Sequence, residues 1–186
     1  MILQKGEIMR VITGKYRGRR LESPWNDETR PTSDKVKEAL FSILQMDIDG
    51  AVFCDVFAGS GGIGIEALSR GAQECYFIEA SNEACKLLSG NIKKCEIEEP
   101  YQVLKGDFRA GLNRIGKKID ILFMDPPYEN DLEIEALEII ASEEIMSENG
   151  IIVVEHSNHT VLPEEIGRFS KYKSKKYGKI ALSFYE

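Results

Sequence analysis

Apolar residues between positions 51 and 155 occur in two alternating kinds of segment. Short apolar runs are typical of buried strands, and the amphipathic segments between them have helical spacing. The runs predict strands at 51–55, 74–79, 101–105, 119–124 and 150–155. The segments between them predict helices at 62–70, 81–94, 108–115 and 132–145. Strict succession of strand and helix predicts right-handed crossovers and a parallel, doubly wound sheet covered by helices.

The two ends of the chain predict β-hairpins instead. From Arg10 to Leu21, β-prone residues alternate with glycines, which indicates a small hairpin arm. Near the C-terminus, β-prone runs at 170–176 and 179–185 are separated by the turn signal Tyr177-Gly178. Together with the central strands, this second hairpin predicts a seven-stranded sheet.

One more helix is predicted between the arm and the first central strand. The segment Arg30-Pro31-Thr32-Ser33 is typical of a helix start, with Thr32 or Ser33 as the N-cap. The apolar residues that follow recur at helical spacing and predict core packing: Val36, Ala39, Leu40, Ile43 and Leu44.

The charges are distributed unevenly along the chain. The formal net charge of −7 argues against a nucleic-acid partner, but distribution matters more than the sum. Residues 10–20 hold five cations and no acid, and residues 168–179 hold six cations and no acid. Acidic residues concentrate at 96–99 and 131–148. This asymmetry is compatible with RNA binding through the ends of the chain.

Composition favours a single α/β domain without a membrane or metal requirement. No apolar run approaches the roughly 20 residues of a membrane span, and residues 1–8 are too short and polar for a signal peptide. We therefore expect a cytoplasmic monomer, with residues 1–8 as an extension before Met9 and residues 9–32 as an arm preceding the main domain. The four cysteines lack C-x-x-C spacing and predict buried free thiols rather than a metal site.

A glycine-rich stretch, 55–64, joins the first central strand to its helix. Its Gly59-x-Gly61-x-x-Gly64 spacing, with Glu79 twenty residues after Gly59, matches a dinucleotide-binding fingerprint. Such a turn can bring a nucleotide-like cofactor close to bare N–H groups at a helix N-terminus. A packing turn without a ligand also fits this spacing.

Acidic residues follow several of the predicted strands at the edge where parallel sheets bind ligands. They are Asp55, Glu79, Asp107 and Asp125. The Glu79 carboxylate could accept hydrogen bonds from ribose hydroxyls, or it could cap the helix that begins near Ser81.

The tetrapeptide Asp125-Pro126-Pro127-Tyr128 closes the fourth central strand. With Asp55 and the glycine stretch, it resembles the S-adenosylmethionine-dependent methyltransferases that modify amino groups of nucleic-acid bases. The Asp125 carboxylate and the Pro126 carbonyl would accept hydrogen bonds from the target amine, and Tyr128 would stack on a flipped-out base. An ordinary proline turn with a surface tyrosine is the alternative.

The arm and the segment at 30–32 narrow the resemblance to the bacterial RsmD family, from Met9 to the C-terminus. That resemblance implies a Rossmann-like fold with an antiparallel C-terminal hairpin, and methylation of the N2 amine of one guanine in 16S rRNA. It also implies an assembled or assembling small ribosomal subunit as the substrate.

The resemblance further assigns residues to the cofactor, S-adenosyl-L-methionine. Asp55 and the backbone from Phe57 to Gly61 would face its methionine portion, and Glu79 its ribose. Asp107 would lie beside the adenine amine, with Phe108 on the ring or in the core. The segment containing Arg30 and Thr32 would help close over the cofactor.

For the RNA, the arm supplies the candidate contacts: Arg10, Lys15, Tyr16, Arg17, Arg19 and Arg20. The cations would bind phosphates and Tyr16 would be available for stacking. A solvated basic hairpin that only covers a sheet edge fits the same residues.

Three other functions compete with this interpretation. A DNA adenine-N6 or cytosine-N4 methyltransferase shares the tetrapeptide but usually needs a sizeable target-recognition domain. A nicotinamide-dependent oxidoreductase shares the glycine spacing but leaves Asp125 to Tyr128 unexplained. A catalytically idle RNA-binding assembly factor would use the arm alone.

Overall fold

The computed structural model of the protein describes residues 9–23, 34–127 and 132–186. The helices are α1 (Asp34–Ile43), α2 (Gly62–Ser69), α3 (Asn82–Lys94), α4 (Phe108–Leu112) and α5 (Leu132–Ser142). The strands are β1 (Met9–Arg10), β2 (Arg20–Leu21), β3 (Val52–Val56), β4 (Glu74–Glu79), β5 (Tyr101–Lys105), β6 (Ile119–Met124), β7 (Met146–Ser157), β8 (Glu165–Ile166), β9 (Phe169–Tyr177) and β10 (Ile180–Tyr185).

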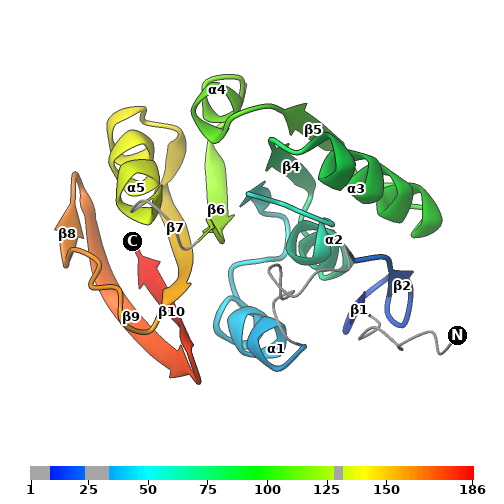
Figure 1. The fold of residues 1–186 in the computed structure, drawn as a ribbon, viewed down its shortest axis with the longest axis horizontal. Coiled ribbons are helices and arrows are strands. Elements are labelled where there is room, and N and C mark those ends of the chain that lie inside the picture. The colour runs from blue at the N-terminus through cyan, green and yellow to red at the C-terminus, as the bar shows by residue number, and fades with distance from the viewer. Residues whose placement is uncertain (1–8, 24–33, 128–131) are drawn as a thin grey trace, which may run out of the picture.

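The central sheet has the strand order β5-β4-β3-β6-β7-β10-β9-β8 (Figure 1). Neighbours from β5 to β7 are parallel, and β10, β9 and β8 are antiparallel to their neighbours. This confirms the predicted α/β class, the C-terminal hairpin and the small N-terminal hairpin. The sheet has eight strands rather than seven because the two-residue strand β8 pairs with the start of β9.

Some predicted boundaries were wrong by three or four residues. Helices α4 and α5 end at Leu112 and Ser142, earlier than the apolar pattern indicated. Strand β7 begins at Met146, because Ile119 pairs with Met146 and Ile121 with Ile151, with an irregularity between them. Extra residues in one strand of a pair form a bulge that an apolar count does not detect.

Helices cover both faces of the sheet. One buried cluster unites α1, α2 and α3 with residues such as Phe53, Phe77 and Phe123. The opposite cluster unites α4 and α5 with Cys54, Tyr76 and other strand residues. The four cysteines are buried free thiols, as predicted. In the described part of the chain, no helix has the length and apolarity needed to cross a membrane.

The N-terminal arm is fixed to α2 by a buried carboxylate. The Glu66 side chain, 0% exposed, accepts hydrogen bonds from the backbone N–H groups of Ile12 (2.7 Å) and Thr13 (3.0 Å). Its oxygens also lie 2.8 Å from Arg70 Nε and 3.5 Å from Lys37 Nζ. Glu66 therefore joins the arm, α1 and α2 at one point.

Lys37 depends on this carboxylate. Its side chain is 1% exposed, and its ammonium donates to the carbonyl of Arg10 at 2.6 Å. Burial lowers the pKa of Lys37, and the attraction of Glu66 opposes that shift. A buried ammonium needs such a partner, because an unpaired charge in the interior is strongly unfavourable.

We predict that Glu66→Ala lowers the free energy of unfolding by about 3–5 kcal/mol, because it leaves the buried Lys37 without its carboxylate partner and two partly buried backbone donors without their acceptor. Urea unfolding followed by circular dichroism measures this change. Glu38→Ala, at an exposed position of α1, is the matched control and should stay within about 0.5 kcal/mol of the wild type. Equal stability of the two variants would contradict the anchoring role of Glu66.

Candidate active site

The candidate site lies where β3 and β6 end. These strands are parallel neighbours with Val56 opposite Met124, so Phe57 and Asp125 leave the sheet side by side. Asp55, the penultimate residue of β3, lies opposite Phe123. The structure thus brings together two acids that are far apart in the sequence.

Asp55 is a buried carboxyl group at the start of α2. It is 2% exposed, and its Oδ2 accepts a hydrogen bond from Gly64 N–H at 2.9 Å. Burial raises the pKa of Asp55 to about 8; the Gly64 bond opposes this shift and the Glu79 carboxylate adds to it. The group therefore holds a proton at neutral pH when no cation is near.

The glycines of the loop have different roles. A Cβ on Gly64 would lie 2.2 Å from the Phe77 ring, and one on Gly61 would lie 2.3 Å from Leu88 Cδ1. Gly64 permits close packing of α2 on β4, and Gly61 permits close approach of the loop to α3. At Gly59, with φ +54°, a Cβ would meet no atom of the described residues within 4 Å. Gly59 is therefore the loop glycine that borders open space.

Three of the four glycines in this stretch do not have the bare N–H groups that the sequence predicted. Gly59 N–H donates to Glu79 Oε2 at 2.8 Å, and Gly61 N–H donates to the Ala58 carbonyl at 2.8 Å. Gly64 N–H is the donor to Asp55. The loop satisfies these donors internally because a tight turn places its own acceptors within reach.

Glu79 forms the contact before α3 that the sequence offered as one of its two roles. Its Oε1 accepts from Ser81 N–H at 2.7 Å, just before α3, while its Oε2 holds Gly59. The side chain is half-buried. Because each carboxylate oxygen has two lone pairs, these two bonds leave acceptor capacity toward the site.

Asp107 and Phe108 lie at the end of β5 on the same edge of the sheet. The Phe57 and Phe108 rings are 5.1 Å apart, which joins the glycine loop to α4. Asp107 caps α4 by accepting from Arg109 N–H at 3.0 Å, and its carboxylate is 2.8 Å from the Arg109 guanidinium. The Asp107 side chain remains 55% exposed, so it stays accessible to a ligand.

Asp125 is surrounded by other carboxylates. Burial raises its pKa well above the ordinary value, and Glu155, Asp55 and Glu133 add to this shift in that order. Asp125 is half-buried and Pro126 is buried. The third residue predicted for catalysis, Tyr128, lies outside the described residues.

Sequence reasoning missed Glu155 and Glu133 as neighbours of Asp125. Both side chains are 3% exposed, Glu155 near the end of β7 and Glu133 in the first turn of α5. A signal was available for Glu155, since it ends its predicted strand as Asp55 and Glu79 end theirs. Glu133 had none, because an acid in the first helical turn is common.

Tyr16 of the arm is not available for the RNA contact predicted for it. That residue is 2% exposed; its hydroxyl donates to Glu99 at 2.5 Å and accepts from Glu98 N–H at 3.0 Å. The stacking prediction for Tyr16 was therefore wrong, because the ring is part of the core.

The cations of the arm are partly neutralised. Lys15 Nζ lies 2.8 Å from both Glu98 and Glu99, and Arg19 lies 3.5 Å from Glu96. Arg10 lies 3.6 Å from Asp34. Within the described residues, Arg17 and Arg20 are exposed and form no ion pair. The sequence could not reveal this, since the acids come from distant segments.

Asn91 ties the end of the arm to the glycine loop. Its side-chain amide donates to the carbonyls of Glu22 (2.8 Å) and Ser60 (2.9 Å), and its oxygen accepts from Glu22 N–H at 2.8 Å. Arg30 and Thr32, which were assigned to cofactor closure, lie outside the described residues.

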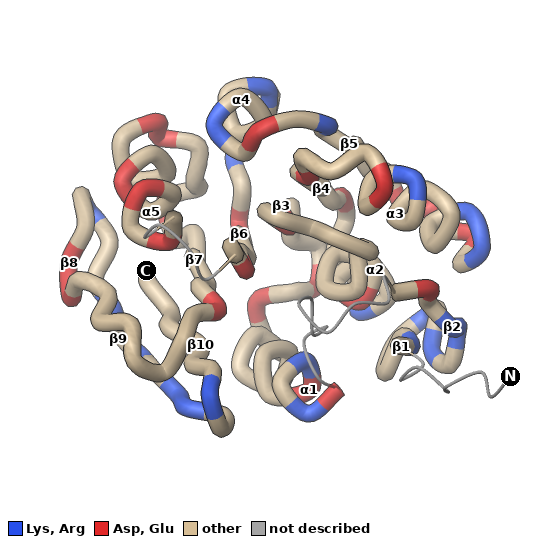
Figure 2. Tube along the Cα trace, in the orientation of Figure 1, with Lys and Arg blue, Asp and Glu red and all other residues tan. Residues whose placement is uncertain are grey.

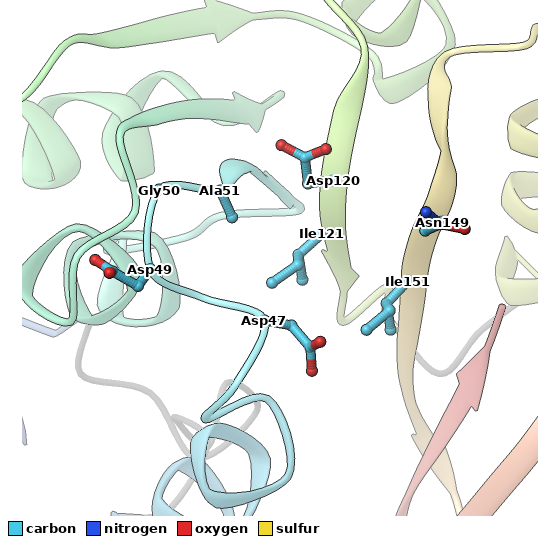
Figure 3. A pocket seen from close by; sticks show the side chains of 8 residues that line it. All are labelled: Asp47, Asp49, Gly50, Ala51, Asp120, Ile121, Asn149 and Ile151. Atoms are coloured by element: carbon cyan, nitrogen blue, oxygen red, sulfur yellow. The ribbon is translucent and has the colours of Figure 1, made fainter.

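A cavity of about 240 Å³ lies at the opposite, amino edge of the sheet (Figure 3). Its lining includes Asp47, Asp49 and Asp120, but Asp120 already accepts from Val52 N–H at 2.9 Å. No group of three His, Cys, Asp or Glu side chains suited to a metal ion occurs in the described ranges. The carboxyl edge, where the glycine loop and Asp125 meet, is therefore the candidate active site.

Comparison with known proteins assigns the chain to a family. The family model described as "Conserved hypothetical protein 95" matches residues 9–186. The ribosomal RNA small subunit methyltransferase D of Escherichia coli K12 is 32% identical over 181 residues, covering 97% of this chain and 90% of that protein. The Haemophilus influenzae protein of the same name is 35% identical over 156 residues, covering 81% of this chain and 79% of that protein.

Solved structures agree with the family at the level of the fold. The Escherichia coli protein yhhF has a TM-score of 0.85 and 30% identity, with 96% of this chain and 97% of that chain covered. A hypothetical protein of Thermus thermophilus has a TM-score of 0.82 and 28% identity, with 95% and 98% covered. With a family match over residues 9–186, two named relatives and the same fold, the chain belongs to the ribosomal RNA small subunit methyltransferase D family.

Proposed function

We propose that this enzyme transfers a methyl group from S-adenosylmethionine to the exocyclic N2 amine of one guanine in small-subunit ribosomal RNA. The observation that carries the proposal is the pairing of β3 with β6, which puts Asp125 beside the glycine loop. A methyl donor held by the loop and an amine held by Asp125 would then meet at one strand junction.

The residues at the carboxyl edge fit the cofactor. Glu79 keeps free lone pairs for ribose hydroxyls, and the exposed Asp107 carboxylate can accept from an adenine amine. Phe57, which is half-buried, offers aromatic surface beside it, and the Phe108 ring 5.1 Å away is part of the core. Asp55 provides a negative charge for the ammonium of the methionine portion. The bound cofactor supplies an electrophilic methyl group on a sulfonium.

Asp125 and Pro126 orient the nucleophile. An exocyclic guanine amine is weakly nucleophilic because its lone pair is delocalised into the ring. Hydrogen bonds from its two protons to the Asp125 carboxylate and the Pro126 carbonyl favour a pyramidal nitrogen with its lone pair directed at the methyl group. Proline at 126 and 127 limits the backbone freedom of this acceptor pair.

The environment of Asp125 suits it to take up a proton. The amine becomes acidic only as the new N–C bond forms and the C–S bond breaks, and it then loses one proton to the Asp125 carboxylate. Burial and, after it, the neighbouring acids raise the pKa of Asp125, which strengthens it as a proton acceptor. A cation bound next to Asp55 favours the ionised form of Asp125 before the reaction.

The direct test uses S-adenosylmethionine labelled in its methyl group and small ribosomal subunits from cells lacking this methylation. We expect the label at N2 of a single guanine of 16S rRNA, located by nuclease digestion and mass spectrometry. Label found only in DNA, in protein or at another atom of the RNA would overturn the proposal.

We predict that Asp125→Ala lowers kcat by about 10²-fold or more, because it removes the acceptor for the amine proton. S-adenosylhomocysteine affinity, measured by calorimetry, should stay within a few-fold of the wild type. Asp47→Ala, at the amino edge, is the control and should retain full activity. Wild-type turnover by Asp125→Ala would contradict the mechanism.

We also predict that S-adenosylhomocysteine binds more tightly as the pH rises from about 6 to about 8. Free Asp55 is protonated below its pKa of about 8, whereas a cofactor ammonium favours the carboxylate, so binding releases a proton. The affinity should rise by up to about tenfold per pH unit and level off above that pKa.

Calorimetry in buffers of different ionisation enthalpy counts the released proton. Asp55→Asn keeps an acceptor for Gly64 N–H but cannot ionise, so its affinity should change little over the same range. If this variant releases the same number of protons as the wild type, the link between Asp55 and the cofactor charge is wrong.

A further inference from the structure

The turn between β9 and β10 lies at the same edge of the sheet as the candidate active site. β10 runs antiparallel to β7 with Ile180 opposite Ser157, the last residue of β7. β7 is in turn parallel to β6, so the β9–β10 turn and Asp125 share the carboxyl edge. Three strand spacings separate β6 from β9, a lateral distance of roughly 15 Å.

Four lysines lie along the second half of β9 and in the turn that follows it, and we call them the hairpin lysines: Lys173, Lys175, Lys176 and Lys179. Three of them are exposed and Lys173 is half-buried. Among the residues that the structure describes, none of the four forms an ion pair with an acid. Figure 2 shows the resulting cationic stretch along β9 and into its turn.

The other end of β9 differs. Lys171 lies 2.6 Å from Glu164, and Arg168 donates to the carbonyls of Ser147 and Glu148. Lys171 and Arg168, the cations far from the active-site edge, are thus each bound to other groups of the protein. Lysines on an edge strand often serve only to prevent edge-to-edge aggregation. That function does not require the lysines to lie at the end of the strand nearest the candidate active site.

The lysines project from both faces of the hairpin. Lys175 pairs with Leu182 and Lys176 with Ala181, so these neighbouring lysines point to opposite faces. No described strand pairs with β9 beyond Ser170 on its outer side, which leaves that side of this stretch accessible. Phosphates of a chain that passes around the turn could be contacted from either face.

We propose that the hairpin lysines bind the phosphate backbone of the RNA segment that flanks the target nucleotide. The inference rests on the proposed function, because it takes RNA as the substrate of the neighbouring site. Compact ammonium groups without acidic partners suit sequence-independent phosphate contacts. On the arm, by contrast, Lys15 and Arg19 are already paired with acids.

The test is the double variant Lys175→Gln/Lys176→Gln, measured with undermethylated small subunits by filter binding between about 50 and 200 mM salt. We expect the Kd for the subunit to rise about tenfold, and the slope of log Kd against log salt to fall by about 1.5 for two lost phosphate contacts. KM for the subunit should rise, while kcat at saturating subunit and the affinity for S-adenosylhomocysteine stay unchanged.

The matched control is Lys86→Gln/Lys93→Gln on α3, which changes the net charge equally at the opposite lateral side of the sheet (Figure 1). Both control lysines are exposed. The control should retain the wild-type slope, and Lys175→Arg/Lys176→Arg should retain wild-type binding. An equal loss of affinity in the control would overturn the inference, because only net charge would then matter.

Binding is measured separately from methyl transfer, so the two proposals can fail independently. A wild-type salt slope in the glutamine double variant would overturn the role of the hairpin lysines and leave the proposed methylation intact. Binding of the wild type to phosphatidylserine vesicles but not to subunits would also overturn it. The double variant could lose subunit binding while the wild type labels no guanine. That result would refute the proposed methylation and leave the role of the hairpin lysines in binding intact.

Discussion

The parallel pairing of β3 with β6 is the constraint on which the rest of the molecule depends. The chain builds outward from β3 through β4 to β5, and then returns to place β6 on the other side of β3. The helices that follow β3 and β6 therefore pack on different faces, and the two strand ends diverge into separate loops. Ligand sites of open α/β sheets form at such a reversal of strand order.

The same pairing concentrates negative charge. Asp55, Asp125 and Glu155 lie at the ends of three adjacent strands, and the pKa values of both aspartates are raised by burial and by neighbouring acids. Without a bound cation this arrangement is unfavourable, because like charges repel in a poorly hydrated site. In the proposed complex, the ammonium and sulfonium charges of the cofactor would offset this repulsion, so the electrostatics that weaken the free protein would favour the bound state.

The N-terminal arm belongs to the folded core rather than forming a detached appendage. Glu66 holds its backbone, Tyr16 is buried in it, and acids from the segment after α3 pair with its cations. The arm also reaches the glycine loop through Asn91. The arm and the glycine loop are thus linked through the same packed interior. Within the described residues, cations without acidic partners remain at Arg17 and Arg20 of the arm and, on the far side of Asp125, at the hairpin lysines.

The sequence by itself determined the α/β class, most element boundaries and the acids at the strand ends, because apolar periodicity and turn residues are local properties. It also identified the methyltransferase family through the glycine loop and Asp125-Pro126-Pro127-Tyr128. Only the tertiary structure decided which charges are neutralised, since Lys15 meets acids more than 80 residues away. It likewise decided that Tyr16 is buried, and that Gly61 and Gly64 serve packing while Gly59 borders open space. Pairing across a fold depends on register and packing, which no local pattern encodes.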